Sequence, residues 1–261
     1  MGKLFLNVLC VIILTVITQI GGVIYLVALL LYRKKTLKKW ITFSLLYLIS
    51  TFAIVPYVAP LFGREKIKTT DSIKIHTFFT SLANRNYVVP EVNNILISVS
   101  STLSKTYPGI EIHCLDANFP FFNGFPLPPH LSHKDGKKLD ISLFYEDDKG
   151  NIVNDKPSVS GYGVFVNPVS EEYNQISVCK EKGYWQYDFS KYLTLGTVHR
   201  DLNFSEKGTR KVIQLLRQES SVSKIFIEPH LRERMKIKHP KVRYHGCRAV
   251  RHDDHIHFQV R

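Results

Sequence analysis

Two long stretches of the chain contain no charged residue. They run from Leu4 to Tyr32 and from Trp40 to Phe62, and apolar side chains dominate both. Because about 20 apolar residues are enough to cross a bilayer, the sequence predicts two transmembrane helices, at about 4–32 and 40–62, that form a membrane anchor over residues 1–62. The alternative for the first stretch is a cleaved signal peptide, but the stretch lacks a clear small-x-small cleavage site and is longer than the usual apolar core of roughly 7–15 residues.

Several motifs are absent as well. The 261 residues contain no His-Glu-x-x-His motif, no internal repeat and no low-complexity segment, and none of the four cysteines stands in a recognisable catalytic motif. The net charge of +13 suggests a polyanionic neighbour, such as nucleic acid, anionic lipid or an acidic wall polymer. The basic residues are spread along the chain without a nucleic-acid-binding motif, so we expect no nucleic-acid partner.

Basic residues separate the two apolar stretches. Five of them lie in the loop 33–39, against Lys3 alone ahead of the first stretch. Since Lys and Arg favour the cytoplasmic side of a membrane, we expect both termini outside the cytoplasm and the soluble part in the periplasm or at the cell exterior. Residues 63–72 are mostly polar and predict a stalk, so the domain itself is expected over residues 73–261.

Strands and helices are expected at irregular intervals in this domain, which favours an α+β fold over a doubly wound sheet. Apolar residues at helical spacing predict helices near 90–106 and 205–219, the second capped by Ser205. Strands are expected near 110–115, 139–145 and 223–229, with a hairpin turn at 146–151. Cys114, Cys179 and Cys247 permit one disulfide in an oxidising compartment, and the sequence leaves the pair open.

Histidines gather at the end of the chain. Successive side chains of a strand point to opposite faces, so His255 and His257 share one face, about 6.6 Å apart along the strand. Two such imidazoles can serve one metal site, one as a ligand and the other as an acid or base. A second group contains His133 and Asp140, which stand seven residues apart around Gly136.

Asp140 lies in the apolar run 139–144, where a buried carboxylate is costly unless a cation or hydrogen bonds compensate for its charge. Each feature alone has an ordinary explanation. Asp140 can face solvent beside Ser142, His133 can be a loop histidine, and His-x-His occurs by chance. The combination of the two groups is more specific than either.

Together they resemble a known group of zinc metallopeptidases, which includes the lysostaphin-type enzymes, the D-Ala-D-Ala peptidases and the hedgehog domain. The resemblance is greatest to the penicillin-insensitive murein endopeptidases. It covers roughly residues 115–261, with a poorly matched middle over 149–203. The matching residues are Ser132-His133, Gly136, Asp140-Ile141, residues 225–229 and 241–243, and His252-x-x-His255-x-His257-x-x-Val260-Arg261.

The resemblance implies a small domain built on an antiparallel sheet, with Zn²⁺ as cofactor. By the same resemblance, the zinc ligands are His133, Asp140 and His257. His255 is then the general base or the stabiliser of the oxyanion, and His252 and His130 line the pocket. Asp254 stands where the related carboxypeptidases carry a catalytic glutamate, so the base stays open between His255 and Asp254.

The activity implied is D,D-endopeptidase hydrolysis of peptidoglycan cross-links, insensitive to β-lactams. The expected partners are peptidoglycan peptide stems and, through both spans, membrane lipid. The expected location is the bacterial inner membrane, with the domain in the periplasm. Two alternatives stay open, which are a D-Ala-D-Ala carboxypeptidase of the same group and a non-catalytic zinc-binding interaction module. The two predicted spans depart from the soluble periplasmic members of the family.

Overall fold

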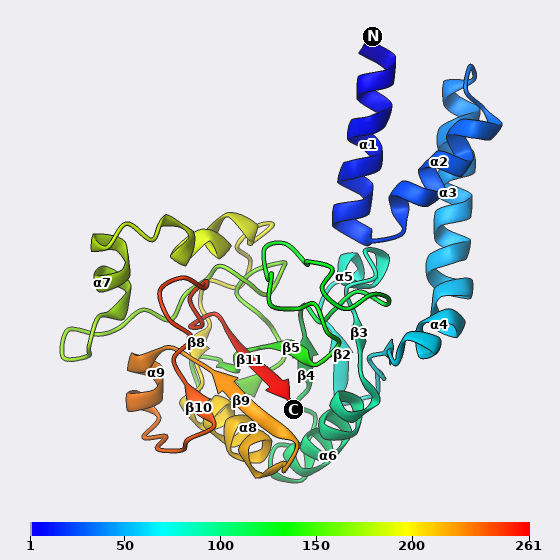
Figure 1. Ribbon diagram of the computed structural model, residues 1–261. Helices are drawn as coiled ribbons and strands as arrows, with labels where there is room; N and C mark the ends of the chain where they lie inside the picture. The colour runs from blue at the N-terminus through cyan, green and yellow to red at the C-terminus, as the bar shows by residue number, and fades with distance from the viewer. Residues whose placement is uncertain (1) are drawn as a thin grey trace.

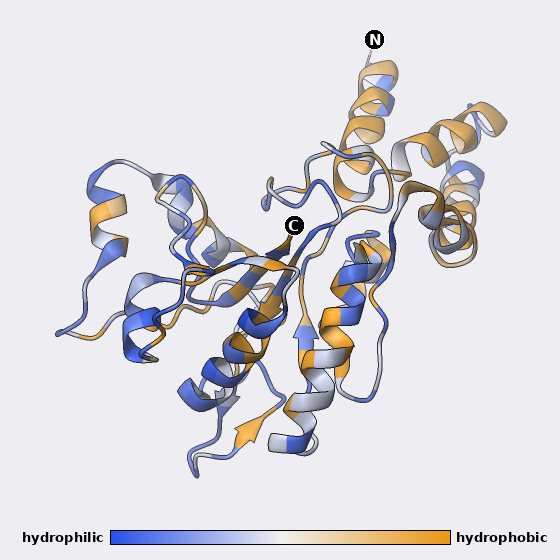
Figure 2. Ribbon diagram, turned by 60° about the horizontal axis from the view of Figure 1, so that its bottom comes forward, coloured by the Kyte–Doolittle hydropathy of each residue, from blue (hydrophilic) through white to orange (hydrophobic). Residues whose placement is uncertain are grey.

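The computed structural model describes residues 2–261 and consists of a helical N-terminal region that projects from a mixed α+β domain (Figure 1). The N-terminal helical region covers residues 2–62. Hydrophobic residues make up most of this region, whereas hydrophobic and hydrophilic residues are mixed in the domain (Figure 2). Its elements are α1 (Gly2–Thr18), α2 (Gly21–Leu31), α3 (Thr36–Ile49), the π-helix η1 (Ser50–Ile54), α4 (Val55–Val58) and the 3-10 helix η2 (Ala59–Phe62).

The first apolar stretch is not a single transmembrane helix, so the prediction of two spans is wrong. The stretch breaks at Gln19, whose φ of 68° ends α1 after 17 residues, and α2 continues for only 11. The break is stabilised from outside the stretch, because the Gln19 side chain bonds the backbone of Phe121. Among the described residues, only Thr36–Phe62 forms a helix long and apolar enough to cross a membrane. This helix suggests association with a membrane.

The break also changes the direction of the chain. The N-terminus and the basic loop 33–39 both lie at the end of the helical region remote from the domain (Figure 1). A hydrogen-bonded chain joins the three helices, in which Lys39 Nζ donates to the Tyr25 hydroxyl (2.9 Å) and that hydroxyl donates to Asn7 Oδ1 (2.7 Å). The helices therefore do not show the expected arrangement, in which the N-terminus lies on the same side as the domain.

The domain is organised on a six-stranded sheet in the order β10-β9-β11-β5-β4-β2. The central strands β9, β11 and β5 are antiparallel, whereas β10 is parallel to β9 and β2 is parallel to β4. The sheet is thus mixed rather than purely antiparallel as expected, since both edge strands join in parallel. The strands are β2 (Ile73–Ile75), β4 (Ile112–Cys114), β5 (Lys138–Ser142), β9 (Val222–Phe226), β10 (Val242–Arg243) and β11 (His255–Val260).

Two amphipathic helices, α6 (Pro90–Thr106) and α8 (Glu206–Gln218), pack against each other and the sheet (Figure 1). Their apolar stripes are buried in the same core as the sheet residues, which explains why helical spacing alone located both. Ser205 is the predicted N-cap of α8, and its side chain accepts a hydrogen bond from the Gly208 amide. The α+β class is confirmed in this general form.

Shorter elements complete the domain. The predicted hairpin exists, but the strand expected over 139–145 is divided, because β5 ends at Ser142 and β6 belongs to a second sheet with the order β7-β6-β8. A third, two-stranded sheet pairs β1 with β3. These elements are β1 (Glu65–Lys66), α5 (Phe78–Leu82), β3 (Tyr87–Val88), β6 (Tyr145–Glu146), β7 (Ile152–Val153), α7 (Gln175–Glu181), η3 (Trp185–Leu193), β8 (Asn203–Phe204) and α9 (Pro229–Arg234).

Residues 63–72 do not form a free stalk. Arg64 is 2% exposed, and β1 pairs with β3 inside the domain. The packed part of the domain therefore begins ahead of Ile73. The disulfide joins Cys179 to Cys247, while Cys114 is buried and free.

The reversal at Gln19 predicts that the N-terminus and the basic loop face the same side of the membrane, opposite the domain. Cysteines placed singly at Lys3, Lys35 and Arg261 in a Cys10→Ser background test this with a membrane-impermeant maleimide on oriented vesicles. We expect Lys3→Cys and Lys35→Cys to be labelled from one side and Arg261→Cys from the other. Labelling of Lys3→Cys together with Arg261→Cys would contradict the observed helix arrangement.

Candidate metal centre

The pairing of β11 with β5 places the predicted residues side by side. His257 stands opposite Asp140 in the antiparallel register, and His255 stands opposite Ser142. Both strands are central in the sheet, so Asp140 and His255 are fully buried and His257 is 2% exposed. The alternation of strand side chains places His255 and His257 on one face, as predicted.

Three potential ligand atoms meet at this position. His133 Nε2 lies 3.0 Å from His257 Nδ1 and 3.2 Å from Asp140 Oδ1, and the last two atoms are 2.8 Å apart. This buried group is able to hold a metal ion. The structure thus brings together His133, Asp140 and His257, the residues predicted as ligands.

The hydrogen bonds of His133 determine which of its nitrogens faces the centre. Its Nδ1 is 2.6 Å from the carbonyl oxygen of Ala117, which can only accept, so Nδ1 carries a proton and Nε2 is the nitrogen that faces the centre. Nε2 and the Asp140 carboxylate, 3.2 Å apart, attract each other only when a proton or a metal cation lies between them. A histidine oriented by a backbone carbonyl is typical of metal ligands. The donor set fits a divalent metal.

The second carboxylate oxygen of Asp140, Oδ2, is fixed by hydrogen bonds. It accepts them from the Tyr162 hydroxyl (2.9 Å) and from His130 Nδ1 (2.5 Å). Burial alone would raise the pKa of Asp140, but His133, His255 and His130 hold this pKa well below its usual value, so the carboxyl is ionised. The Tyr162 hydroxyl keeps its proton, because burial and neighbouring carboxylates raise its pKa well above the usual value.

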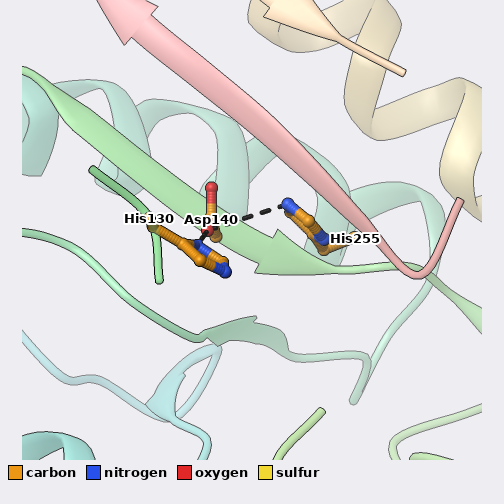
Figure 3. A group of neighbouring side chains, drawn as sticks. All are labelled: His130, Asp140 and His255. Atoms are coloured by element: carbon orange, nitrogen blue, oxygen red, sulfur yellow. Dashed lines mark hydrogen bonds and ion pairs between the residues drawn. The ribbon is translucent and has the colours of Figure 1, made fainter. Parts of the chain in front are cut away.

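His130, Asp140 and His255 form a second group that is able to hold a metal (Figure 3). In this group His255 Nε2 is 3.7 Å from Asp140 Oδ2, and that oxygen already accepts the Tyr162 hydrogen bond. The group of His133, Asp140 and His257 is the better candidate, because its three atoms are mutually closer and, among the described residues, Asp140 Oδ1 has no donor outside this group.

His255 is oriented by its neighbour Asp254. Asp254 Oδ1 accepts from His255 Nδ1, and its Oδ2 accepts from the Gly163 amide at 2.7 Å. Asp254 is therefore directed away from the pocket, whereas His255 Nε2 is buried with no hydrogen-bond partner among the described residues. Burial opposes a charge on His255, but Asp140 and Asp254 outweigh it and raise its pKa to about 9. Of the two residues predicted as the base, only His255 faces the centre.

A pocket of about 530 Å³ opens onto these histidines. His252 lines it as predicted, and burial together with the neighbouring histidines lowers its pKa well below the usual value, so the imidazole is neutral. Trp185 and Phe189 of η3 form part of the wall, and Arg248 is the one Lys or Arg side chain among the described lining residues. No acidic side chain of residues 2–261 lines the pocket.

Two residues at or near the centre, Tyr162 and His245, were not predicted from the sequence. Tyr162 lies in the poorly matched middle segment, in a loop with no regular element. His245 lines the pocket with its ring 5.4 Å from that of His252, and it belongs to the loop that Cys247 fastens to α7 through the disulfide. Neither residue belongs to a motif, and only the composition offered a signal, since the chain has 11 histidines.

The chain matches no family model, and no curated protein matches it. Its function is therefore inferred from the geometry of the candidate metal centre.

Replacement of a ligand should abolish metal binding. We expect Asp140→Ala to lose zinc, because one anionic ligand disappears and two histidines alone hold the ion weakly, whereas His255→Ala should keep the metal. Asp147→Ala, in the exposed hairpin turn, is the carboxylate control and should bind zinc like the parent protein. The metal content of the purified full chain is measured by mass spectrometry. A folded Asp140→Ala protein with full zinc occupancy would rule out this ligand set.

Tyr162→Phe tests the hydrogen bond behind Asp140. The phenyl ring preserves the packing but leaves Oδ2 with one donor fewer, so we expect zinc affinity to fall about tenfold, as for other partners that orient a ligand. Competition with a chromophoric chelator measures this affinity. An unchanged affinity would show that His130 alone orients the carboxylate.

Proposed function

We propose that the protein is a membrane-anchored zinc metallopeptidase that hydrolyses peptidoglycan peptide cross-links. The observation that carries the proposal is the convergence of His133 Nε2, Asp140 Oδ1 and His257 Nδ1 within 3.2 Å of one another beside an oriented His255. Two nitrogen ligands and one oxygen ligand leave one position of a tetrahedral zinc site open, as in catalytic sites. The resemblance to the murein endopeptidases rests on these same residues.

The residues around the metal centre have separate roles in the proposed hydrolysis. When bound, zinc supplies a Lewis acid that activates water and polarises the scissile carbonyl. His255 Nε2 is the group placed to move a proton to or from the reacting atoms, and Asp254 holds the ring in that orientation. Tyr162 and His130 fix Asp140 from behind. A metal with only a structural role would need neither the free His255 Nε2 nor an open pocket, so these features favour an enzyme over a binding module.

The pocket favours an acidic peptide as substrate. Among the described residues it offers Arg248 and no carboxylate, which suits the carboxyl groups of a peptidoglycan stem. The endopeptidase assignment within the group rests on the contiguous Ser132-His133 pair, since the carboxypeptidase relatives place the serine one residue further from the histidine. Asp254, which pointed toward the carboxypeptidases, bonds His255 and the Gly163 amide instead of facing the pocket.

The proposed location is the bacterial inner membrane with the domain in the periplasm. The apolar helix Thr36–Phe62 supports a membrane location. The start of α1 and the basic loop 33–39 both lie at the end of the helical region remote from the domain. The positive-inside rule associates such basic segments with the cytoplasmic side, which supports a location of the domain outside the cytoplasm. The Cys179–Cys247 disulfide agrees with an oxidising compartment.

Cross-linked muropeptide dimers and uncross-linked pentapeptide monomers, offered side by side to the full chain, test the activity. We expect release of monomers from dimers, inhibition by a chelator, and no effect of penicillin, because hydrolysis by a zinc-activated water forms no acylated serine that penicillin could trap. The products are identified by mass. His255→Ala, which should retain its metal, is the matched inactive control.

Two outcomes would contradict this proposal. Loss of only the terminal D-Ala from pentapeptides would assign the protein to the carboxypeptidases. A zinc-loaded chain that cleaves neither substrate would favour the non-catalytic interaction module.

A further inference from the structure

The N-terminal helical region contacts the loop that carries two of the site histidines. This site loop, residues 115–137, connects β4 to β5 and contains His130 and His133. At the break between α1 and α2, Gln19 Oε1 accepts from the Phe121 amide (2.9 Å) and Gln19 Nε2 donates to the Phe121 carbonyl (3.3 Å). Gln19 is only 6% exposed, so these two hydrogen bonds are shielded from water.

Arg64, two residues after the apolar helix ends, holds the site loop more extensively. Its guanidinium donates to the carbonyl oxygens of Phe119 and Phe121 (2.6 Å to the latter), to Asn123 Oδ1 (2.7 Å) and to the carbonyl of Lys134 (3.5 Å). Hydrogen bonds from a charged donor are stronger than neutral ones. A single buried side chain thus ties the first part of the site loop to the residue that follows His133.

Gly136 makes this approach possible. Its φ is 80°, and a Cβ atom at this position would lie 3.0 Å from Arg64 Nε and 3.1 Å from Val89. A larger residue would meet both the unfavourable backbone conformation and Arg64. The glycine that the sequence singled out between His133 and Asp140 therefore has a structural reason, which is to admit Arg64.

Aromatic packing reinforces the same contact. Phe62, the last residue of η2, packs edge-on against Phe121 and Phe122, with ring centroids 4.9 and 5.4 Å apart. On the other side of the site loop, Arg85 donates to the carbonyl of Pro128 (2.9 Å). The site loop is thus held between the domain and the helical region, and His133 depends on it for its place.

We propose that Arg64 and Gln19 are positioning residues for the metal centre, so that the contact of the site loop with the N-terminal helical region, and with Arg64 just after it, sets the metal affinity of the domain. The inference rests on the metal site proposed above. The helical region is then more than a tether, because it completes the support of the loop that bears a ligand. Without Arg64, the site loop loses all four bonds that its guanidinium makes, which are the bonds that join residues 119–123 to the carbonyl beside His133 through one side chain.

The test uses the full chain in lipid nanodiscs, stripped with a chelator and titrated with zinc against a chromophoric competitor. We expect Arg64→Gln to lower zinc affinity about tenfold, in the range found when residues that orient ligands are lost, and Gln19→Ala to lower it less. Arg64→Lys should rescue only in part, since one ammonium cannot reach four acceptors spread over the site loop. The visible spectrum of the cobalt-substituted protein should change in Arg64→Gln, because the ligand geometry changes.

Arg234→Gln is the matched control, since Arg234 bonds Glu172 and the carbonyl of Asn167 without touching the site loop. It should lower the melting temperature of the metal-free protein but keep the parent zinc affinity and cobalt spectrum. If Arg64→Gln keeps the parent affinity, or if Arg234→Gln loses as much, the positioning role is wrong. If Arg64→Gln does not fold, Gln19→Ala decides, and an unchanged affinity in that variant overturns the proposal. A parent chain that binds no zinc would instead remove the proposed metal site itself.

Discussion

The candidate metal centre depends on one buried charge, the carboxylate of Asp140. It lies on a central strand with no exposure to solvent, where an uncompensated charge would strongly destabilise the fold. The structure compensates for it from two sides. Oδ2 accepts hydrogen bonds from Tyr162 and His130, while Oδ1 faces His133 and His257. The arrangement of the surrounding loops follows from this requirement, because each brings a donor or a metal ligand to the same carboxylate.

The partners of Asp140 come from segments with very different properties. His257 lies directly opposite on β11, so the sheet itself determines its place. The site loop brings His130 and His133, and Tyr162 comes from the irregular segment between β7 and α7. The rigid sheet thus sets the core of the centre, and the loops complete it. Further along the chain, η3 follows α7 and forms part of the pocket wall, so η3 shapes access to the centre.

The helical region and the domain meet at the site loop, without a flexible linker between them. In a tethered enzyme the anchor and the catalytic domain are commonly separated by a flexible linker, which lets the domain change its orientation. Here Arg64 is buried and β1 pairs with β3 directly after the apolar helix. The pocket therefore keeps a defined orientation to the helical region, which a flexible linker would not provide.

The sequence by itself determined those features that depend on nearby residues. Helical spacing located α6 and α8, and Ser205 indicated the start of α8. Strand alternation placed His255 and His257 on one face, and the apolar run around Asp140 indicated a carboxylate that needs compensation. Each conclusion follows from the period of a single element, which residues a few positions apart already express.

Only the tertiary structure decided the features that depend on distant partners. The break at Gln19 is stabilised by Phe121, 102 residues away, a partner that the uncharged stretch by itself does not reveal. The direction of Asp254 depends on the Gly163 amide, 91 residues away. The pairing of Cys179 with Cys247 and the place of Tyr162 behind Asp140 likewise arise only when the loops pack on the sheet. Such contacts have no local period, because the residues that form them share only a position in the folded chain.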